Sequence, residues 1–138
     1  MYSFPTPLGG MFIWLRMHLA SHPLADRLEG GQPRLANALW LFLTKKPYLV
    51  LVSPGRIFAP TKEIEKERAW EYFRLCFAAV EEKEVDEMSE RFAKGVRAFW
   101  DLKEKDIKDL EDEEEQAVAK GEGESAEEGL AVLMARGC

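Results

Sequence analysis

The sequence predicts an α/β protein of the two-layer α+β type, in which a small sheet of about three strands is covered by two helices. Short apolar or alternating runs, typical of strands, occur at residues 11–19, 48–52 and 70–78. Apolar residues recur at helical spacing from Pro33 to residue 46 and again over residues 83–105. With 138 residues, 46% of them hydrophobic, the chain can build one core and has little room for two.

The first strand is predicted over residues 11–19, after a turn that contains Gly9 and Gly10. Its alternation separates a mixed face from a wholly apolar one. The apolar face consists of Met11, Ile13, Leu15, Met17 and Leu19. A surface loop is predicted over residues 20–32, where Ser, His, Pro and Gly gather.

The middle of the chain predicts a helix, a buried strand, a helical turn and a second strand. Pro33 suits the first turn of the helix, and Lys46-Pro47 ends it. The continuous apolar run 48–52 favours a buried strand. Thr61 is a candidate cap for a charged helical turn over residues 62–68, and residues 70–78 form the next strand.

The C-terminal part predicts a long amphipathic helix followed by an acidic tail. Apolar residues three or four apart define the helix over residues 83–105. After residue 110 the chain becomes acidic and then rich in Gly, Glu, Ser and Ala, without any aromatic residue, which predicts disorder. We therefore expect a domain over residues 1–105 and an acidic, largely disordered tail over residues 106–138.

Composition excludes several function classes. Residues 101–138 hold 13 acidic and 5 basic side chains, and no basic stripe is interleaved with aromatics, so nucleic acid is not expected as a partner. The apolar runs are far shorter than the roughly 20 residues that span a bilayer, and no signal peptide precedes them, so we expect no membrane association and a cytoplasmic location. Cys76, Cys138, His18 and His22 lack ligand spacing, which argues against a metal site. Both histidines are expected to be solvated or at strand ends.

Arg74 is the candidate functional residue that the strand pattern singles out. It alternates with Phe73 and Leu75 on a strand expected inside the sheet, where a guanidinium needs an anionic partner to offset its desolvation. One possibility is an internal ion pair with one of the many glutamates, which the strand alone favours because structural pairs are the commoner kind. The other is bidentate capture of a ligand carboxylate, which suits the planar guanidinium.

Three segments carry a resemblance to a known family, in that family's order. Residues 8–15 (LGGMFIWL) resemble the P-x-G-G-M-F-x-W start of a strand in class I/II aminotransferases, which are fold-type I pyridoxal-phosphate enzymes. Residues 49–58 (LVLVSPGRIF) resemble the family's V-L-V-x-P-G-x-x-F strand and turn, and residues 72–78 (YFRLCFA) its F-R-L-x-F-A strand. The resemblance covers residues 7 to about 102 and implies the C-terminal small domain of such an enzyme.

The resemblance implies a binding role for four residues. Arg74 would hold the α-carboxylate of the amino-acid substrate, which reverses the preference for an internal ion pair. Gly9, Gly10 and Phe12 would line the approach to the cofactor, and residues 54–55 would shape a loop near the entrance.

Simpler explanations remain open for the residues around Arg74. A plain turn explains Gly9 and Gly10 as well as a site role does. For Phe12 and Trp14, packing in the core is favoured. If the chain lacks a large domain on which to pack, we expect an exposed apolar patch that includes part of the Phe12 and Trp14 face.

The implied activity is pyridoxal-phosphate-dependent transfer of an amino group between an amino acid and a 2-oxo acid, and a homodimer is one assembly open to the complete enzyme. The family holds the cofactor through a Schiff-base lysine, an aspartate and a phosphate cup in a preceding large domain. No lysine here lies in a Ser-rich site motif. We therefore expect a fragment or truncated member of the family, without catalytic residues, that neither binds the cofactor stably nor transaminates alone. The alternatives are a stand-alone binding or regulatory domain derived from that fold, and part of a lyase or synthase that uses the same cofactor.

Overall fold

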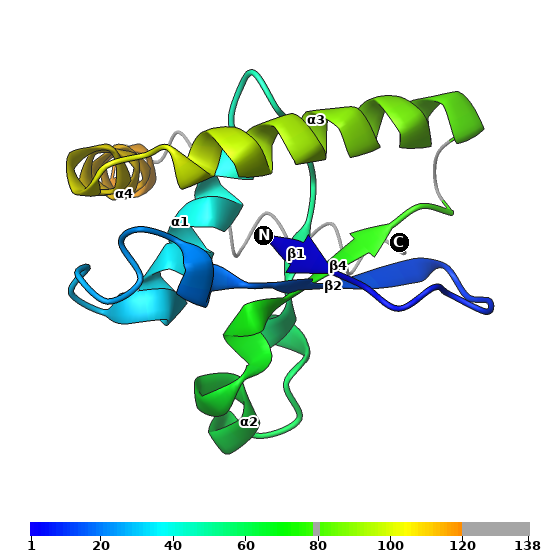
Figure 1. Ribbon diagram of the computed structural model, residues 1–138, viewed down its shortest axis with the longest axis horizontal. Coiled ribbons are helices and arrows are strands. Elements are labelled where there is room, and N and C mark those ends of the chain that lie inside the picture. The colour runs from blue at the N-terminus through cyan, green and yellow to red at the C-terminus, as the bar shows by residue number, and fades with distance from the viewer. Residues whose placement is uncertain (79–80, 120–138) are drawn as a thin grey trace.

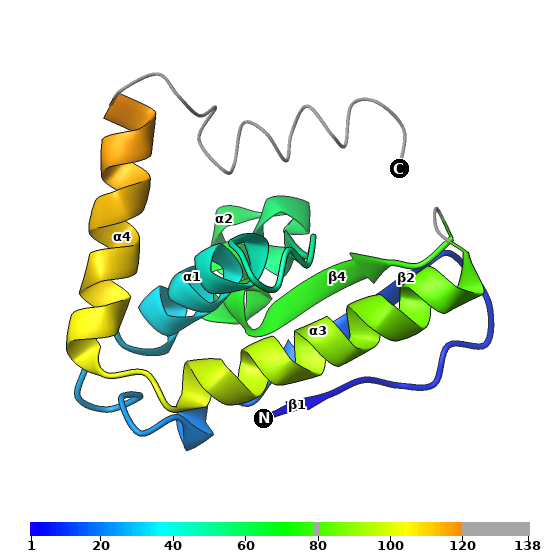
Figure 2. The ribbon, with the colours of Figure 1, turned by 90° about the horizontal axis from the view of Figure 1, so that it is seen from above.

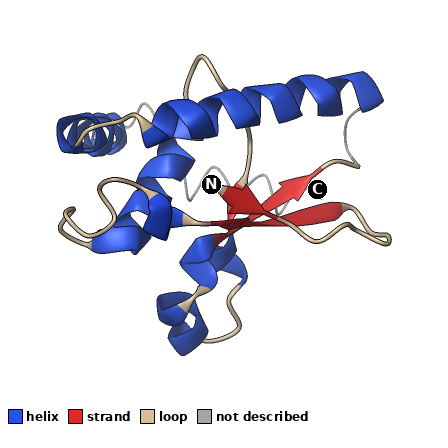
Figure 3. Ribbon diagram, in the orientation of Figure 1, coloured by secondary structure: helices blue, strands red, loops and turns tan. Residues whose placement is uncertain are grey.

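The computed structural model describes residues 1–78 and 81–119 and has an α+β architecture, which confirms the predicted class (Figure 1, Figure 3). Four antiparallel strands form one sheet in the order β1-β2-β4-β3. The strands are β1 (Tyr2–Ser3), β2 (Phe12–Met17), β3 (Ser53–Pro54) and β4 (Tyr72–Cys76). The sheet has one strand more than expected because the short β1 pairs with the end of β2.

Four α-helices accompany the sheet in the described residues: α1 (Gly31–Thr44), α2 (Lys62–Glu67), α3 (Glu82–Trp100) and α4 (Glu104–Ala119). Short 3-10 turns are η1 (Leu19–Ser21), η2 (Gly55–Phe58) and η3 (Ala69–Glu71). Figure 1 shows α3 along one face of the sheet and α2 on the opposite side. Seen from above, α4 lies beyond the C-terminal end of α3 and runs at a steep angle to it (Figure 2). No helix among the described residues is long and apolar enough to cross a membrane.

The hydrophobic core lies on the face of the sheet that α1 and α3 cover. The alternation of β2 and β4 points Leu15 and Phe73, which are directly opposite each other, into this core. Apolar positions of the two helices complete it, among them Leu35, Leu39 and Leu43 of α1 and Phe92, Val96 and Phe99 of α3. The alternation predicted for both strands is therefore confirmed within β2 and β4, whereas Met11, predicted on the apolar face, lies before β2 and is exposed. The opposite face carries the mixed set of residues.

Local signals set the starts of three helices, and the sequence predicts those at Thr61 and Pro33. The Thr61 hydroxyl accepts a hydrogen bond from the N–H of Ile64 at 3.4 Å and caps α2. At the start of α3, Glu81 and Glu84 exchange side-chain and backbone hydrogen bonds in a capping box. Pro33 lies in the first turn of α1.

The strand predicted over residues 48–52 is wrong. After α1, the N–H groups of Tyr48 and Leu49 both donate to the carbonyl of Lys45, and Leu49 has a φ of 49° in the left-handed region. This turn interrupts the extended backbone, so pairing with β4 is confined to β3. Val50 and Val52 are still buried. The segment is apolar because these side chains contribute to the core, and not because it forms a strand.

The disordered tail is wrong for residues 106–119, which belong to α4. Ile107 is fully buried against the core, and the guanidinium of Arg34 on α1 forms an ion pair with Glu111 at 2.6 Å. Lys45 forms a more exposed pair with Glu113 at 3.0 Å. The acidic segment is therefore held by Arg34 of α1 and by Lys45 directly after α1, and the rest of the predicted tail, residues 120–138, lies outside the described residues.

The loop over residues 20–32 is packed against the core, contrary to the prediction of a surface loop. Ala25 and Leu28 are buried, and His22 is only 3% exposed, so the prediction of a solvated histidine is wrong. The His22 ring contacts Phe99 and Trp100, with ring centroids 5.2 and 5.3 Å away. Its Nε2 donates to the carbonyl of Phe99 at 3.1 Å, and its Nδ1 accepts from the N–H of Leu24 at 3.1 Å.

Candidate functional site

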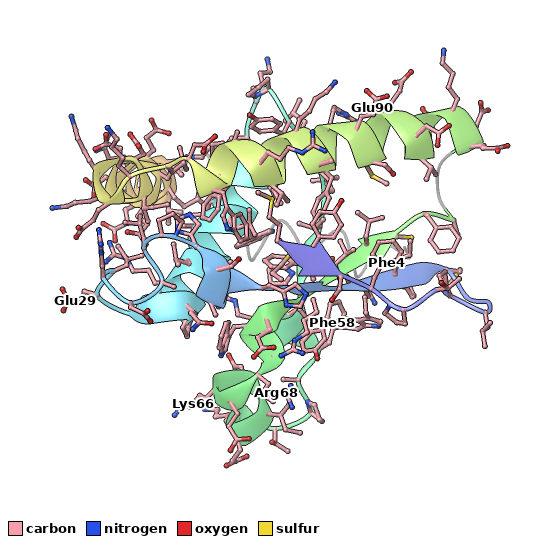
Figure 4. All side chains as sticks on the ribbon, viewed as in Figure 1. Phe4, Glu29, Phe58, Lys66, Arg68 and Glu90 are labelled. Carbon is pink, nitrogen blue, oxygen red and sulfur yellow. The ribbon has the colours of Figure 1, made fainter. Side chains whose placement is uncertain are left out.

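Arg74 lies on the face of the sheet opposite the core, directly across from Trp14 of β2. Its guanidinium carbon is 4.1 Å from the centre of the Phe12 ring and 3.9 Å from the centre of the Phe58 ring. Phe12 comes from β2 and Phe58 from η2, and Figure 4 shows Phe58 on the side of the sheet where α2 lies. Two aromatic rings therefore hold a half-buried guanidinium by cation–π contacts.

No carboxylate of the described residues forms an ion pair with Arg74, so the internal ion pair favoured by the strand pattern alone is not found there. Arg16 lies on the same face, and its Nε donates to Glu71 at 2.7 Å. This hydrogen bond raises the pKa of Arg16 above its ordinary value. Glu71 therefore pairs with Arg16 and not with Arg74. The rings of Phe12 and Phe58 contact the flat face of the Arg74 guanidinium, so the N–H groups at its edge can donate to an acceptor.

The structure brings Phe12 to Arg74, but it gives the two glycines no contact there. A Cβ added to Gly9 or Gly10 would meet nothing within 4 Å, so no close approach within the described chain requires a glycine at either position. Gly10 has a φ of 95°, which favours glycine in the turn before β2. The turn interpretation therefore accounts for Gly10 by itself.

The preference for core packing at Phe12 and Trp14 is wrong. Both residues lie on the sheet face that points away from the core. Trp14 is 40% exposed, although its ring packs edge-on against Phe58 with the ring centroids 5.6 Å apart. Further exposed apolar side chains near this end of the sheet include Leu8 and Met11. On this face Trp14 is exposed, and Phe12 is half-buried under its contact with Arg74.

Phe58 is the site residue that sequence reasoning missed, although it ends the motif at residues 49–58. Its position depends on Gly55, where an added Cβ would lie 2.7 Å from the carbonyl oxygen of Ala69 and 2.8 Å from that of Tyr72. The close approach at Gly55 allows η2 to pack on η3 and β4, and this packing carries Phe58 over the sheet. The spacing of glycine and phenylalanine in the motif was the available signal.

An apolar cavity of about 230 Å³ adjoins the Arg74 site, with Phe58 and Trp14 as shared walls. Its lining residues are Trp14, Gly55, Phe58, Ala59, Pro60, Ile64, Arg68, Ala69 and Tyr72. A Schiff-base cofactor requires a lysine. No lysine is among the residues that line this cavity, and the two rings that contact Arg74 belong to Phe12 and Phe58. In this part of the described chain the residues do not fit pyridoxal phosphate, and the arrangement can bind a carboxylate without providing that chemistry.

Comparison with known proteins identifies no relative: no family model matches the sequence, and no curated protein or solved structure matches it either.

Proposed function

We propose that the chain is a carboxylate-binding small domain of the aminotransferase type, and that Arg74 holds the α-carboxylate of an amino acid or a 2-oxo acid. The observation that supports this function is the guanidinium stacked on Phe12 and Phe58 without a carboxylate partner among the described residues. Stacking fixes the plane of the guanidinium, and a fixed plane favours bidentate contact with a carboxylate.

The resemblance to class I/II aminotransferases supports the same proposal, because Arg74 occupies the arginine position of the F-R-L-x-F-A motif. The chain would then be a fragment or truncated member of that family. Amino-group transfer would require a lysine-bearing large domain to bind the cofactor, and this chain's contribution would be to bind and orient the substrate carboxylate. We further propose that the exposed face around Trp14 packs on that domain.

The test is a titration of ¹⁵N-labelled protein followed through the Arg74 Nε–H resonance. L-alanine, pyruvate and acetate share a carboxylate and should shift this resonance, whereas methylamine, which has none, should not. Arg74→Lys keeps the charge but removes the planar fork, and it should weaken carboxylate binding by about 2 to 3 kcal/mol.

The matched control is Arg16→Lys, on the same face of the sheet but paired with Glu71. This variant should bind carboxylates as the native chain does. If Arg74→Lys also binds with native affinity, or if Arg16→Lys alone loses binding, Arg74 is not the carboxylate site.

A stand-alone binding domain is a second candidate, favoured by one observation: both rings that hold Arg74 come from this chain. The two candidates differ in what a large domain adds. Co-expression with a candidate lysine-bearing domain, followed by an aminotransferase assay of native and Arg74→Lys chains, should give Arg74-dependent activity only if the chain is part of an enzyme.

A further inference from the structure

A second cavity, of about 310 Å³, lies at the β3 edge of the sheet, between residues of α1 and α2. We refer to it as the indole cavity because Trp40 of α1 and Trp70 of η3 line it. Phe73 also lines it and points to the core face of β4, whereas Arg74 points to the opposite face. The indole cavity is therefore separate from the Arg74 site.

The deep walls of the indole cavity are apolar. Ala36, Trp40, Pro54 and Phe73 line it and are all buried, and the half-buried Trp70 adds further aromatic surface. Ala36 lies four residues before Trp40 on α1, and its small side chain leaves room beside the large indole. Flat aromatic walls favour a flat aromatic ligand, because rings pack on one another in offset or edge-to-face geometry.

The charged side chains of the indole cavity are not among its deep walls. Glu65 and Lys66 of α2 are exposed, and their charges are opposite. Arg56 is half-buried and already engaged within the chain, since its Nη2 donates to Asn37 Oδ1 at 3.2 Å. A charged ligand would lose its hydration against apolar walls that hold no charged residue, which is unfavourable. The lining therefore favours a neutral ligand.

The neutral polar groups of the lining are hydrogen-bond donors. Because an arginine can only donate, its bond orients Asn37 with Oδ1 toward Arg56 and leaves the amide N–H groups of Asn37 as donors. Trp40 is 3% exposed, and its Nε1–H has no hydrogen-bond partner among the described residues. Asn37 and Trp40 are three residues apart on α1 and are therefore neighbours on its surface. Buried donors without an acceptor are unfavourable, so a ligand with an acceptor complements this lining better than one with a donor.

We propose that the indole cavity binds a small, neutral, planar aromatic molecule with a carbonyl acceptor, such as an aromatic ketone or amide, independently of Arg74. The ring of the ligand packs against the aromatic walls, and its carbonyl oxygen accepts from the amide of Asn37, next to Trp40. The apolar walls provide affinity for the ring, and the donor sets its orientation.

The test uses the indole N–H resonances of the four tryptophans, Trp14, Trp40, Trp70 and Trp100, in ¹⁵N-labelled protein. Acetophenone is the probe. Of the two controls, acetone lacks the ring, and benzoate carries a carboxylate in place of the neutral carbonyl group. Acetophenone should shift Trp40 and Trp70 in a saturable manner, and both controls should bind there at least several-fold more weakly. The proposal would be overturned by the absence of a saturable shift, by shifts confined to Trp14, or by benzoate binding as tightly as acetophenone.

Matched variants of α1 test the donor of Asn37. Asn37→Asp keeps the shape of the side chain and an acceptor for Arg56 but removes the amide N–H groups, and ethylbenzene serves as a ligand without an acceptor. The ratio of acetophenone affinity to ethylbenzene affinity should fall roughly threefold to tenfold in this variant, the range of one neutral hydrogen bond. Gln32→Glu adds the same charge to α1 outside the cavity walls and should leave the ratio unchanged. An unchanged ratio in Asn37→Asp, or an equal fall in both variants, would contradict the proposal.

A further variant tests the volume of the cavity. Ala36→Leu fills space beside Trp40 and should abolish the acetophenone shifts of Trp40 and Trp70, with folding checked by the unchanged resonance of Trp100. Persistence of the shifts in this variant would place the ligand elsewhere and count against the proposal. In Arg74→Lys the shifts should persist, because acetophenone has no carboxylate, so failure of the proposed function and failure of the indole cavity are distinguishable.

Discussion

Arg74 and Arg16 lie on the same face of the sheet, yet only Arg16 has a carboxylate partner among the described residues. Alternation along the strand correctly predicts the face on which Arg74 lies, because side-chain direction in a strand has a period of two. It cannot predict that Glu71 pairs with Arg16, or that Phe58 reaches Arg74 from another segment. Both depend on how η2 and η3 pack, which strand periodicity does not encode.

The buried His22 predicts a pH-dependent stability. Burial lowers the pKa of His22 below its ordinary value of 6.5, and the hydrogen bond to the carbonyl of Phe99 only partly opposes this effect. Protonation of Nδ1 would also break the hydrogen bond from the N–H of Leu24. Between the lowered pKa and 6.5 the unfolded chain binds more protons than the folded one, so the free energy of unfolding should fall as the pH drops below about 6.5.

Urea unfolding at pH 7.5 and pH 5.5 measures this effect. The native chain should lose stability at the lower pH, and His22→Gln should show a smaller difference between the two conditions. The control is His18→Gln, because His18 is exposed and the hydrogen bond of its imidazole in the described structure is with the hydroxyl of Ser3. If His22→Gln keeps the full difference, the titrating group is another one.

Among the elements, the start of α3 is well predicted, but the helix ends at Trp100 and not at residue 105, and α4 is not predicted. The apolar residues of α3 recur at helical spacing within the segment itself, so its sequence alone predicts a helix. A capping box lies at its start. The helix α4 has only Ile107 fully buried, and its partners Arg34 and Lys45 lie 77 and 68 residues away in the chain. From the sequence, a run of glutamates is interpreted as solvated, because the basic residues that pair with it lie in a distant segment of the chain. The carboxylate of Asp106, which accepts from the N–H of Lys103 at 2.8 Å, was a usable local signal for the start of α4.

Docking of α4 can be tested through its buried isoleucine. Ile107→Ala should reduce the free energy of unfolding by about 2 to 4 kcal/mol, because it removes fully buried methyl groups and leaves a cavity. Val118→Ala, at a position 44% exposed on the same helix, should change it by less than about 0.5 kcal/mol. Urea unfolding followed by circular dichroism measures both, and equal stabilities would mean that α4 does not share the core.

For the molecule as a whole, composition and periodicity predict the α+β class and the face on which the core lies. They do so because burial of apolar positions is encoded in the spacing of each element. The proposed resemblance to the aminotransferase family rests on three short motifs alone, because no family model, curated protein or solved structure matches the sequence. The face that carries Trp14 and Arg74 is the part of the molecule where the motifs and the structure coincide, since the motif residues Phe12 and Phe58 meet Arg74 there.

The whole molecule also predicts the response to pyridoxal phosphate. A stable internal aldimine needs a lysine amine and a phosphate-binding site in one place, and the lysines of α2 and α3 lie on exposed, charged surfaces. Added cofactor should therefore give no saturable internal-aldimine absorbance band with this chain. Absorbance titration of the native chain is the measurement. The expectation would be contradicted by a saturable band that disappears in a single Lys→Gln variant, such as Lys66→Gln. Such a band would mean that the chain itself binds the cofactor through that lysine.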